Sequence, residues 1–502
     1  MVIVRSTSSG RRVALLCSAA ITLLFLSGCT APRQLSDEQV GEAARQRMQL
    51  LDARRAQLAD GLTLAEAMAW AMDNNLNIRA EALERTMAGN SRRLARMSML
   101  PSLTAQAGYR SRDNLLASRS ASVATGATSL VPSTSTDRSS ETASLELSWN
   151  VLDFGLAWLR ARHEGDRVHI ATEARRRMSY QVALEVVSAW DRALAYQRLA
   201  PALEATRADV AAALRQTDVI ARSRLRDPVD VLDFRSALLL VLKRMDSLSL
   251  QLNQSRDELT RLLGLPAGTP LQLEEGSGLA VDGLPAAELR HWQYVALHNR
   301  PEIRQSLYGK RMAERGGLRR TVEQFPALLL RYGANYDSNS YLVNNEWQDT
   351  SVTLSMGLMR LASLPLQRRA AAIERQQAEN QADLQAVVVL AQVAIAEKEL
   401  KHARRAACLG DALASTSNER LGLLEVRARA AAIDGLSLVR ARVDNLLVRL
   451  EQEVAAADAR RAMLMMAQSV GIGAMPDSIG AAAGAERVAA VNAWLGSGFP
   501  GQ

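Results

Sequence analysis

Side chains that could carry out catalytic or metal chemistry are few in this sequence, and they are scattered. The histidines form no HExxH motif and no comparable metal-ligand spacing. A phosphate-binding glycine loop and the GxSxG turn of a hydrolase nucleophile are also absent from the sequence. We therefore predict that the chain is not an enzyme and uses no cofactor and no metal ion. The histidines are expected to be surface or core residues: His163, His169, His291, His298 and His402.

One residue, Cys29, lies in a pattern that predicts covalent modification. Three arginines precede an apolar run over residues 13–26, which leads into Leu-Ser-Gly-Cys. The run is shorter than the roughly 20 apolar residues that span a bilayer, but it has the size of a signal-peptide core. Its ending resembles a bacterial lipobox, which implies cleavage before Cys29 and lipid attachment to this cysteine; Thr30 favours the outer membrane. An ordinary signal peptide with a coincidental cysteine is the alternative.

The other two cysteines do not provide an intrachain disulfide. Cys17 leaves with the predicted signal peptide and Cys29 is predicted to be lipidated, so Cys408 has no partner in the mature chain. Cys408 lies among alanines and arginines in a helical pattern, and we interpret it as a structural residue.

The composition favours long helices. Apolar residues make up 48% of the 502 residues, but aromatic residues only 4%. Alanine, leucine, arginine, glutamate and glutamine dominate, which is typical of coiled coils and long helices. The net charge of +8 is modest for this length, and no basic block alternates with aromatic residues. Nucleic-acid binding is therefore not expected.

The elements that position any functional residue come from a duplication. One pattern, Asn74-x-x-x-Ile78-Arg79, returns 225 residues later as Asn299-x-x-x-Ile303-Arg304. The same offset, without a gap, relates Met87 to Met312, Pro101 to Pro326, Leu103 to Leu328 and Gly108 to Gly333. The period is far too long for a solenoid. We interpret the chain as two tandem copies of one helix-to-strand unit.

The first copy begins with a helix that leads into two strands. Thr63 and Glu66 form a capping box at the start of this helix. Pro101 ends the helix, because proline has no N–H and clashes with the preceding turn. Alternation of apolar and polar residues then predicts strands over about 102–112 and 141–151, with a Ser/Thr-rich loop between them.

A very long helix follows the second strand. Residues 153–222 contain no strong helix breaker apart from Pro201. At about 1.5 Å per residue, this helix would be roughly 105 Å long. Apolar residues inside it step by four and three, as in a coiled-coil seam: Val182, Val186, Ala189, Ala193, Tyr196, Ala200 and Leu203. Asp227-Pro228 supplies a turn, and a return helix is predicted over about 229–263.

The second copy follows the same plan. We predict, in chain order, a helix over about 287–323, strands over about 327–336 and 350–361, a long helix over about 366–429 and a return helix to about 470. The predicted domains are a signal peptide (1–28), an N-terminal linker (29–61), a first repeat (62–264), an inter-repeat linker (265–286), a second repeat (287–471) and a flexible tail (472–502).

The strands have the properties of membrane-spanning strands. They are about ten residues long, they alternate, they carry aromatic residues near their ends, and the chain is exported. Four strands cannot close a barrel, and an open sheet edge is not tolerated in lipid. Two chains would give eight strands, which is too narrow for a solute path, whereas three give twelve. The predicted fold class is mainly α with a small β part: long coiled-coil α-hairpins from two repeats, plus four transmembrane strands that contribute to a trimeric 12-stranded barrel.

Local sequence matches point to a family. The segment 149–155 (WNVLDFG) looks like the strand-to-helix junction of TolC-type outer membrane factors. The segments 230–235 (DVLDFR) and, more loosely, 436–442 (LSLVRAR) look like the helix starts that follow the periplasmic tips of these channels. With the duplicated plan, the chain from about 62 to 473 resembles this family, and the lipobox fits its lipoprotein branch.

The resemblance implies a function and partners. Members of the family are homotrimeric exit ducts in the outer membrane of Gram-negative bacteria. They passively conduct solutes in tripartite efflux or type I secretion systems, together with a periplasmic adaptor protein and an inner-membrane pump of the RND or ABC type. The chain would then be lipid-anchored and barrel-inserted, in contact with outer-membrane lipid, with a large helical domain in the periplasm. The transported substrate cannot be inferred from the sequence.

The resemblance also directs attention to the helix tips. In familiar members, carboxylates just past the second-repeat tip hold the channel closed; Ser437 and Arg440 stand at the matching positions here. Our hypothesis is an altered gate in which Arg440 or Arg429 pairs with Asp230 or Asp434. The tip candidates are Asp227, Asp230, Asp233, Arg429, Asp434, Ser437 and Arg440. Ordinary solvated helix ends with favourable N-terminal acids are the alternative. The tips also lack the family's usual glycine, which puts a standard adaptor docking geometry in doubt.

Two other classes of function stay open. A non-conducting periplasmic coiled-coil lipoprotein could serve as a scaffold for an envelope complex, and it would have no membrane-embedded strands. An envelope enzyme is disfavoured by the absence of catalytic motifs.

Overall fold

A computed structural model describes residues 34–58, 61–223, 227–275, 287–430, 432, 435–472 and 484–496. The chain divides into two compact units, with the boundary between Leu58 and Ala59.

The first unit contains a helix that the sequence analysis did not predict. Helix α2 (Asp37–Arg55) lies in the segment expected to be a linker. A capping box starts it: the Ser36 hydroxyl accepts from the Gln39 N–H, and the Gln39 side chain accepts from the Ser36 N–H. None of its residues is buried. The helix was missed because it has no apolar stripe, which is the main sequence signal for a helix.

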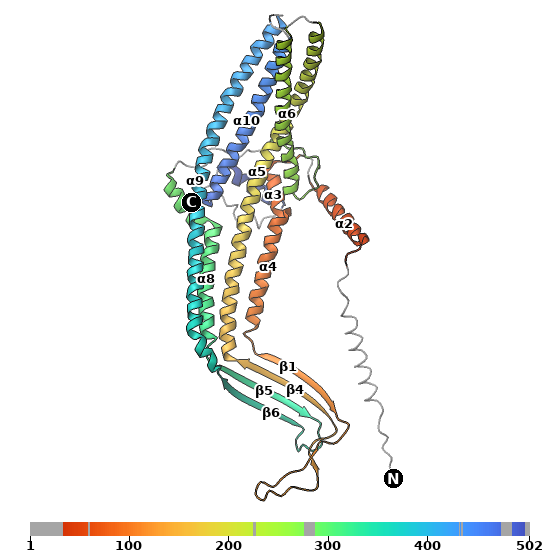
Figure 1. Ribbon diagram of the computed structural model, residues 1–502, viewed down its shortest axis with the longest axis vertical. Helices are drawn as coiled ribbons and strands as arrows, with labels where there is room; N and C mark the ends of the chain where they lie inside the picture. The colour runs from red at the N-terminus through yellow and green to blue at the C-terminus, as the bar shows by residue number, and fades with distance from the viewer. Residues whose placement is uncertain are drawn as a thin grey trace. The chain divides into compact units, whose positions relative to one another are not determined.

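The second unit contains both repeats, and each has the predicted order of elements (Figure 1). The first repeat comprises α3 (Leu64–Asn74), α4 (Leu76–Met97), β1 (Ser102–Ser111), β4 (Ser139–Asn150), α5 (Val151–Ser223) and α6 (Pro228–Leu262). The second comprises α7 (Leu289–Asn299), α8 (Pro301–Val322), β5 (Ala327–Asp337), β6 (Glu346–Ser355), α9 (Leu358–Arg429) and α10 (Gly435–Val470). The fold is therefore mainly α with a small β part, as predicted.

The first predicted helix is in fact two helices. The Thr63–Glu66 capping box is present at the start of α3. Asn75 then leaves the helical conformation, with φ −65° and ψ 123°, and its side chain accepts hydrogen bonds from the N–H groups of Asn77 and Ile78. Asparagine can end one helix and cap the next, because its side chain offers the backbone an alternative partner. The prediction of one continuous helix was wrong at this position.

The second repeat has the same break, 225 residues later. Arg300 has φ −64° and ψ 130°, and Pro301 is the first residue of α8. A residue before proline avoids the helical conformation, because the proline ring clashes with it. This break was not predicted either, although Pro301 was a visible signal for it.

Boundaries near the second hairpin also differ from the prediction. Strand β6 ends at Ser355, whereas the predicted strand continued to about residue 361. Helix α9 begins at Leu358 and contains Pro365, whereas the prediction placed the helix start after this proline. Helix α9 therefore continues through Pro365, which removes one intrahelical hydrogen bond without ending the helix.

The four strands form one antiparallel sheet in the order β1-β4-β5-β6. The two hairpins have the same register: Leu103 pairs with Leu147, and the duplicated Leu328 pairs with Leu354. The long loop of the first hairpin contains a small two-stranded sheet of β2 (Ala117–Ser118) and β3 (Ser133–Thr134). The duplication therefore extends to individual strand pairs.

The helices lie beside one another in a fixed order. Next to the sheet, α5 packs between α4 and α8, and α9 packs against α8. Further from the sheet, α5 packs between α6 and α10, and α9 packs against α10 (Figure 1). One lateral edge of this unit is therefore formed by β1, α4 and α6, and the opposite edge by β6 and α9. These are called the first edge and the second edge below.

The core follows the predicted seam of α5. Val182, Val186, Ala189 and Ala193 are all at most 5% exposed. A further cluster joins α5, α6 and α10 and includes Leu199, Leu203, Val210, Leu238, Met245, Val443, Leu446 and Leu450. The predicted coiled-coil seam is confirmed, and it joins the two repeats.

The segment expected to be a flexible tail contains a packed helix. Helix α12 (Gly484–Gly496) contacts α3, and its Val491 and Trp494 are buried. Arg487 makes an ion pair with Asp73 of α3. Residues 484–496 of the predicted tail therefore form a helix that two apolar side chains anchor to the unit.

Candidate functional site

The four-stranded sheet has one apolar and one polar face. Register places residues of like character opposite one another, for example Leu147 opposite Tyr332 and Ser148 opposite Arg331. The apolar face is exposed, and its large side chains are Leu103, Tyr109, Leu145, Leu147, Trp149, Tyr332, Tyr336, Val352 and Leu354. An exposed apolar face of this size indicates contact with lipid or with another apolar surface.

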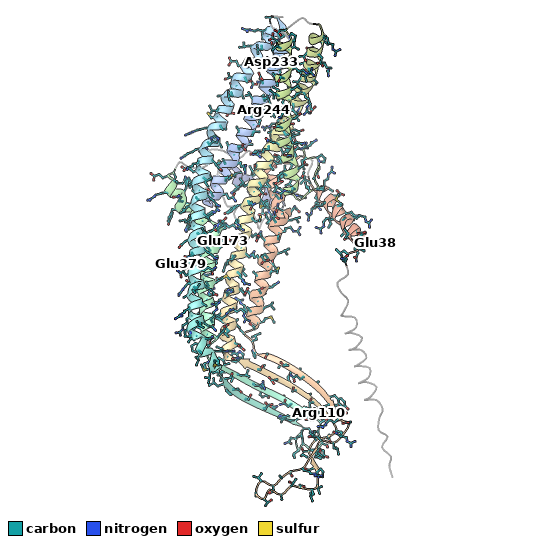
Figure 2. The ribbon with its side chains drawn as sticks, viewed as in Figure 1. Glu38, Arg110, Glu173, Asp233, Arg244 and Glu379 are labelled. Atoms are coloured by element: carbon teal, nitrogen blue, oxygen red, sulfur yellow. The ribbon has the colours of Figure 1, made fainter. Side chains whose placement is uncertain are left out.

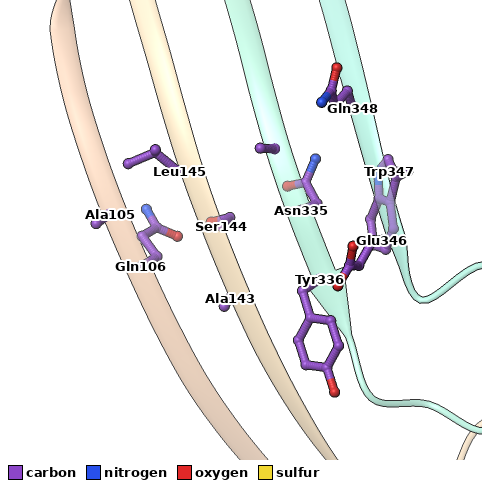
Figure 3. Close-up of a pocket in the computed structure, with 11 residues that line it drawn as sticks. Ala105, Gln106, Ala143, Ser144, Leu145, Asn335, Tyr336, Glu346, Trp347 and Gln348 are labelled. Atoms are coloured by element: carbon purple, nitrogen blue, oxygen red, sulfur yellow. The ribbon is translucent and has the colours of Figure 1, made fainter.

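The polar face carries paired charges. Arg331 of β5 forms an ion pair with Glu146 of β4, with Nε 3.1 Å from the carboxylate, which joins the two repeats across the sheet. Asn335 donates to Asp349 of β6. Figure 3 shows the four strands side by side in the part of the sheet where Asn335 lies, and Figure 2 shows Arg110 further along the sheet. A hydrated lumen is the usual environment for such a face in a membrane barrel.

The two lateral edges have no partner within the described part of the chain. There, β1 pairs only with β4 and β6 only with β5, so each presents one unpaired row of backbone groups. The helices that continue these edges expose apolar side chains at coiled-coil spacing. On α4 these are Leu76, Leu83, Met87, Leu94 and Met97; on α6 they are Leu232, Leu239 and Leu250; on α9 they include Ile373, Leu384, Val387, Ile395 and Leu409.

The first-repeat tip is capped by one of the predicted acids. Asp227 accepts a hydrogen bond from the Val229 N–H at 2.8 Å and is the N-cap of α6. Asp230 and Asp233 follow on α6 and are exposed, and Figure 2 shows Asp233 near the tip. Acids at these positions favour the helix through its dipole. For Asp227, the structure therefore shows the capping role that was given above as the alternative to a gate.

Two of the predicted gate residues, Arg429 and Arg440, lie at the second-repeat tip. Arg429 donates to the backbone oxygen of Glu425 at 3.4 Å, and Arg440 is exposed. Among the described residues, no ion pair joins Arg429 or Arg440 to Asp230. Asp434 lies outside the described residues, and so does the lipidation candidate Cys29. Ser437, the other second-repeat candidate, is exposed at the start of α10.

A different arginine joins the helices near this tip. Arg442 of α10 reaches Asp209 of α5 at 3.3 Å and Glu425 of α9 at 3.4 Å. It therefore links three helices, although all three side chains are about 40% exposed and the pairs contribute little to stability. Arg442 belongs to the 436–442 match, but nothing in the sequence distinguished it from Arg440.

Two ion pairs cross the seam between α5 and α10. Asp191 accepts from Arg460 Nε at 2.7 Å, and Arg192 donates to Asp458 at 2.7 Å. Burial raises the pKa of Asp191, and the attraction of Arg460 only partly opposes this. The seam therefore contains one carboxylate whose charge is costly in the folded state.

The reactive side chains outside the tips lie apart from one another. Cys408 is a free and exposed thiol, which does not support the structural role predicted for it. His169 stacks on Tyr308, with ring centroids 4.9 Å apart. No group of acidic, histidine or cysteine side chains within the described residues could hold a metal ion. Likewise, no helix in the described ranges is long and apolar enough to cross a membrane.

Comparison with known proteins identifies the fold. No protein-family model and no curated protein matches the sequence. Among solved structures, the outer-membrane channel OprN matches with a TM-score of 0.62 and 16% identity over 81% of this chain and 89% of OprN. CusC matches with a TM-score of 0.61 and 16% identity, over 81% of this chain and 92% of CusC. The open state of the Neisseria gonorrhoeae MtrE outer membrane channel matches with a TM-score of 0.62 and 16% identity, over 81% and 88%. The chain therefore has the fold of TolC-type outer-membrane channels, as the sequence resemblance implied.

Proposed function

We propose that this chain is one subunit of a homotrimeric outer-membrane channel that conducts solutes passively out of a Gram-negative cell. The observation that carries the proposal is the sheet: it has an apolar face, a polar face and two unpaired edges. Lipid tolerates such a sheet only when the edges are closed by other strands. Three copies would close it into a barrel of about twelve strands, wide enough for a solute path.

The helical edges support the same assembly. The exposed apolar side chains of α4 and α6 lie on the first edge, and those of α9 lie on the second edge. A head-to-tail contact between these two different edges is heterologous, and it forms a closed ring when the rotation between copies allows it. The strands and the helices would then form a ring through the same contact, because β1, α4 and α6 lie on the first edge and β6 and α9 lie on the second edge.

A channel of this kind needs an energy source elsewhere, since no nucleotide-binding motif is present in the sequence. We propose that an inner-membrane pump of the RND or ABC type and a periplasmic adaptor supply it, with the adaptor at the helix tips. Efflux and type I secretion are both compatible with this arrangement. The chain would be anchored through lipid on Cys29 and inserted in outer-membrane lipid through its barrel.

The resting gate is proposed at the tips. Arg440 is exposed at the start of α10 and is available to carboxylates of a neighbouring copy. Arg429, Asp230, Asp233 and Asp434 are the other charged candidates. In a trimer these residues would face a common axis, so a pair between copies would differ from anything present in one chain.

Conductance in planar bilayers tests the proposal. Wild-type trimers should give discrete channels, and Arg440→Ser combined with Asp434→Asn should raise the open probability by removing gate charges. Arg244→Ser, on α6 away from the tip, is a control for charge loss and should leave gating unchanged. Absence of conductance in both wild type and the gate variant would reject the channel. In that case, lack of heat-modifiable trimers in outer-membrane fractions would favour the periplasmic scaffold.

A further inference from the structure

A row of aromatic side chains leads from the sheet onto α5. Trp149 lies on the apolar face of the sheet and contacts Phe154 edge to face, with ring centroids 6.0 Å apart. Trp158 and Arg162 follow at intervals of four residues, so they lie on the same side of the helix as Phe154. The Arg162 guanidinium lies over the Trp158 ring, 4.0 Å from its centroid. This side of α5 therefore continues the apolar face of the sheet.

The row ends at a basic hollow between α4, α5 and α8. The hollow has a volume of about 290 Å³. Five arginines line it, and they come from all three helices: Arg92, Arg96, Arg162, Arg311 and Arg315. Asp166 is the only carboxylate among the lining residues. The net charge of the hollow therefore depends on which of these arginines Asp166 neutralises.

The hollow keeps an excess of positive charge. Asp166 is 2% exposed and is already bound by Arg311, from Nε at 3.0 Å, and by Arg315. Within the described chain, Arg92, Arg96 and Arg162 have no carboxylate partner. The Arg92 side chain lies next to Gly165 of α5. A Cβ added to Gly165 would be 3.7 Å from Arg92 Nε. Three unneutralised guanidinium groups therefore surround a partly enclosed space, and an anion would relieve their repulsion.

The chemistry and the position favour a phosphate group. The planar guanidinium binds phosphate oxygens through two parallel N–H groups, and several arginines can surround one phosphate. Trp149, Phe154 and Trp158 form the kind of aromatic belt that lies at a membrane interface. Arg162 is four residues beyond Trp158, or about 6 Å along the helix. This is the depth of the headgroup layer, where basic pockets bind acidic lipids.

We propose that this hollow binds the phosphate headgroup of an acidic phospholipid in the periplasmic leaflet of the outer membrane. The inference rests on the proposed barrel, because only a membrane at the sheet brings lipid to this height. Arg92, Arg96 and Arg162 supply the binding charge, and Trp158 packs beside the glycerol region. The bound lipid fixes the depth of the channel at the point where strands give way to helices.

Fluorescence quenching tests the site in the full-length protein. The protein is placed in phosphatidylcholine nanodiscs that contain a small fraction of brominated phosphatidylglycerol or brominated phosphatidylcholine. Bromine quenches nearby tryptophan, and Trp158 lies at the hollow. Wild type should prefer the acidic lipid by about fivefold or more, since one basic side chain at an anionic surface contributes a factor of this size. Equal quenching by the two lipids in wild type would overturn the proposal.

Variants assign the preference to these arginines. Arg92→Gln, Arg96→Gln and Arg162→Gln together should reduce the preference to about onefold. A matched triple, Arg93→Gln, Arg160→Gln and Arg368→Gln, removes the same charge from exposed residues outside the hollow and should retain the preference. Loss in both triples would mean that total charge, not this site, selects the lipid, and would overturn the proposal. If the first triple does not assemble, the exposed single variant Arg96→Gln replaces it, with a partial loss expected.

Two other occupants give different results. Inorganic phosphate, added at constant ionic strength, should leave the lipid preference in place; abolition of the preference would assign the hollow to free phosphate. Carboxylates of a neighbouring copy could also fill the hollow, because α4 lies on an edge, and wild type would then show no preference.

Conductance is recorded on the same preparation. A conducting wild type without lipid preference rejects the lipid site alone, whereas a non-conducting one rejects the proposed channel.

Discussion

The helix break of the first repeat and that of the second solve one structural problem with different side chains. Asn75 and Arg300 have nearly the same backbone angles and are 225 residues apart. Asn75 donates from its amide to the Leu262 oxygen at 3.1 Å, and Arg300 donates from Nη1 to the Gln468 oxygen at 3.1 Å. In each repeat, the break is therefore tied to the end of the returning helix.

The difference lies in what else each side chain must satisfy. Asn75 also caps α4, which begins without a proline. In α8, Pro301 fixes the first turn, and proline at this position suits a helix start. The Arg300 side chain does not cap α8. It instead donates hydrogen bonds to Glu302 and Gln392, at 3.0 and 2.7 Å. The duplication preserved the backbone shape and the link to the returning helix, while the remaining polar contacts diverged.

The first prediction extends the comparison from one chain to the trimer. Within the chain, Leu145 of β4 pairs with Ala334 of β5. The shared hairpin register makes Val352 the counterpart of Leu145 and Tyr109 the counterpart of Ala334. If the repeats are equivalent around the ring, Val352 should pair with Tyr109 of the partner subunit.

Cysteine crosslinking measures this register. Val352→Cys with Tyr109→Cys, in a Cys408→Ser background, should give near-complete crosslinked trimers on denaturing gels, because opposed strand residues lie within disulfide distance. Val352→Cys with Gln106→Cys is the control, since Gln106 faces the other side of the sheet. Equal crosslinking of both pairs, or of neither, would break the equivalence of the repeats.

Arg300→Met tests the break that contains a buried ion pair. Arg300 is 7% exposed, and its loss leaves Glu302 as an unpaired charge that is itself largely buried. We expect a loss of about 3–5 kcal/mol in the free energy of unfolding. Chemical denaturation in detergent at fixed protein concentration measures it. Arg304→Met, at a side chain 43% exposed, is the control. Its partner Glu173 keeps Arg176 at 3.7 Å, so this variant leaves no unpaired charge and should cost under about 1 kcal/mol.

Asn75→Ala tests the other break and should have a smaller effect. It removes one helix cap and one buried hydrogen bond but leaves no buried charge. The expected loss is about 1–3 kcal/mol in the same denaturation experiment. A loss as large as that of Arg300→Met would show that the two breaks contribute equally to the free energy of unfolding, contrary to the comparison.

The smallest expected effect concerns the seam that joins the repeats. Because burial raises the folded-state pKa of Asp191, the folded protein takes up its proton at a higher pH than the unfolded chain does. Stability should therefore rise as pH falls from this folded pKa toward the unfolded value of about 3.9, and fall as pH rises through the folded pKa. Asp191→Asn should lack this dependence.

Melting temperatures of wild type and Asp191→Asn across this pH range make the comparison. The wild-type value minus the variant value should increase toward acid. A decrease toward acid would show that the attraction of Arg460 outweighs burial, which would make the pair a stabilising link between the repeats.

Much of the fold was predictable because its signals are local and periodic. The capping box at Thr63, the proline at Pro101 and the alternating strands each depend on residues close together in the sequence. Helix α2 and helix α12 were missed because one has no apolar stripe and the other has few anchors in an alanine-rich tail. The tip candidates could be named from the sequence, but their partners could not, because charges at helix ends have many possible partners.

By itself, the sequence determined the duplicated plan, the two faces of the strands and the seam of α5, since periodicity specifies which side of an element is apolar. Tertiary structure alone decided which partners meet. It placed Asn75 and Arg300 at equivalent helix breaks. It also made Arg442, and not Arg440, the link between three helices, and it brought arginines from α4, α5 and α8 around one hollow. The physical reason is range: periodicity acts within one element, whereas a pair or a hollow requires elements that are distant in the chain to pack side by side.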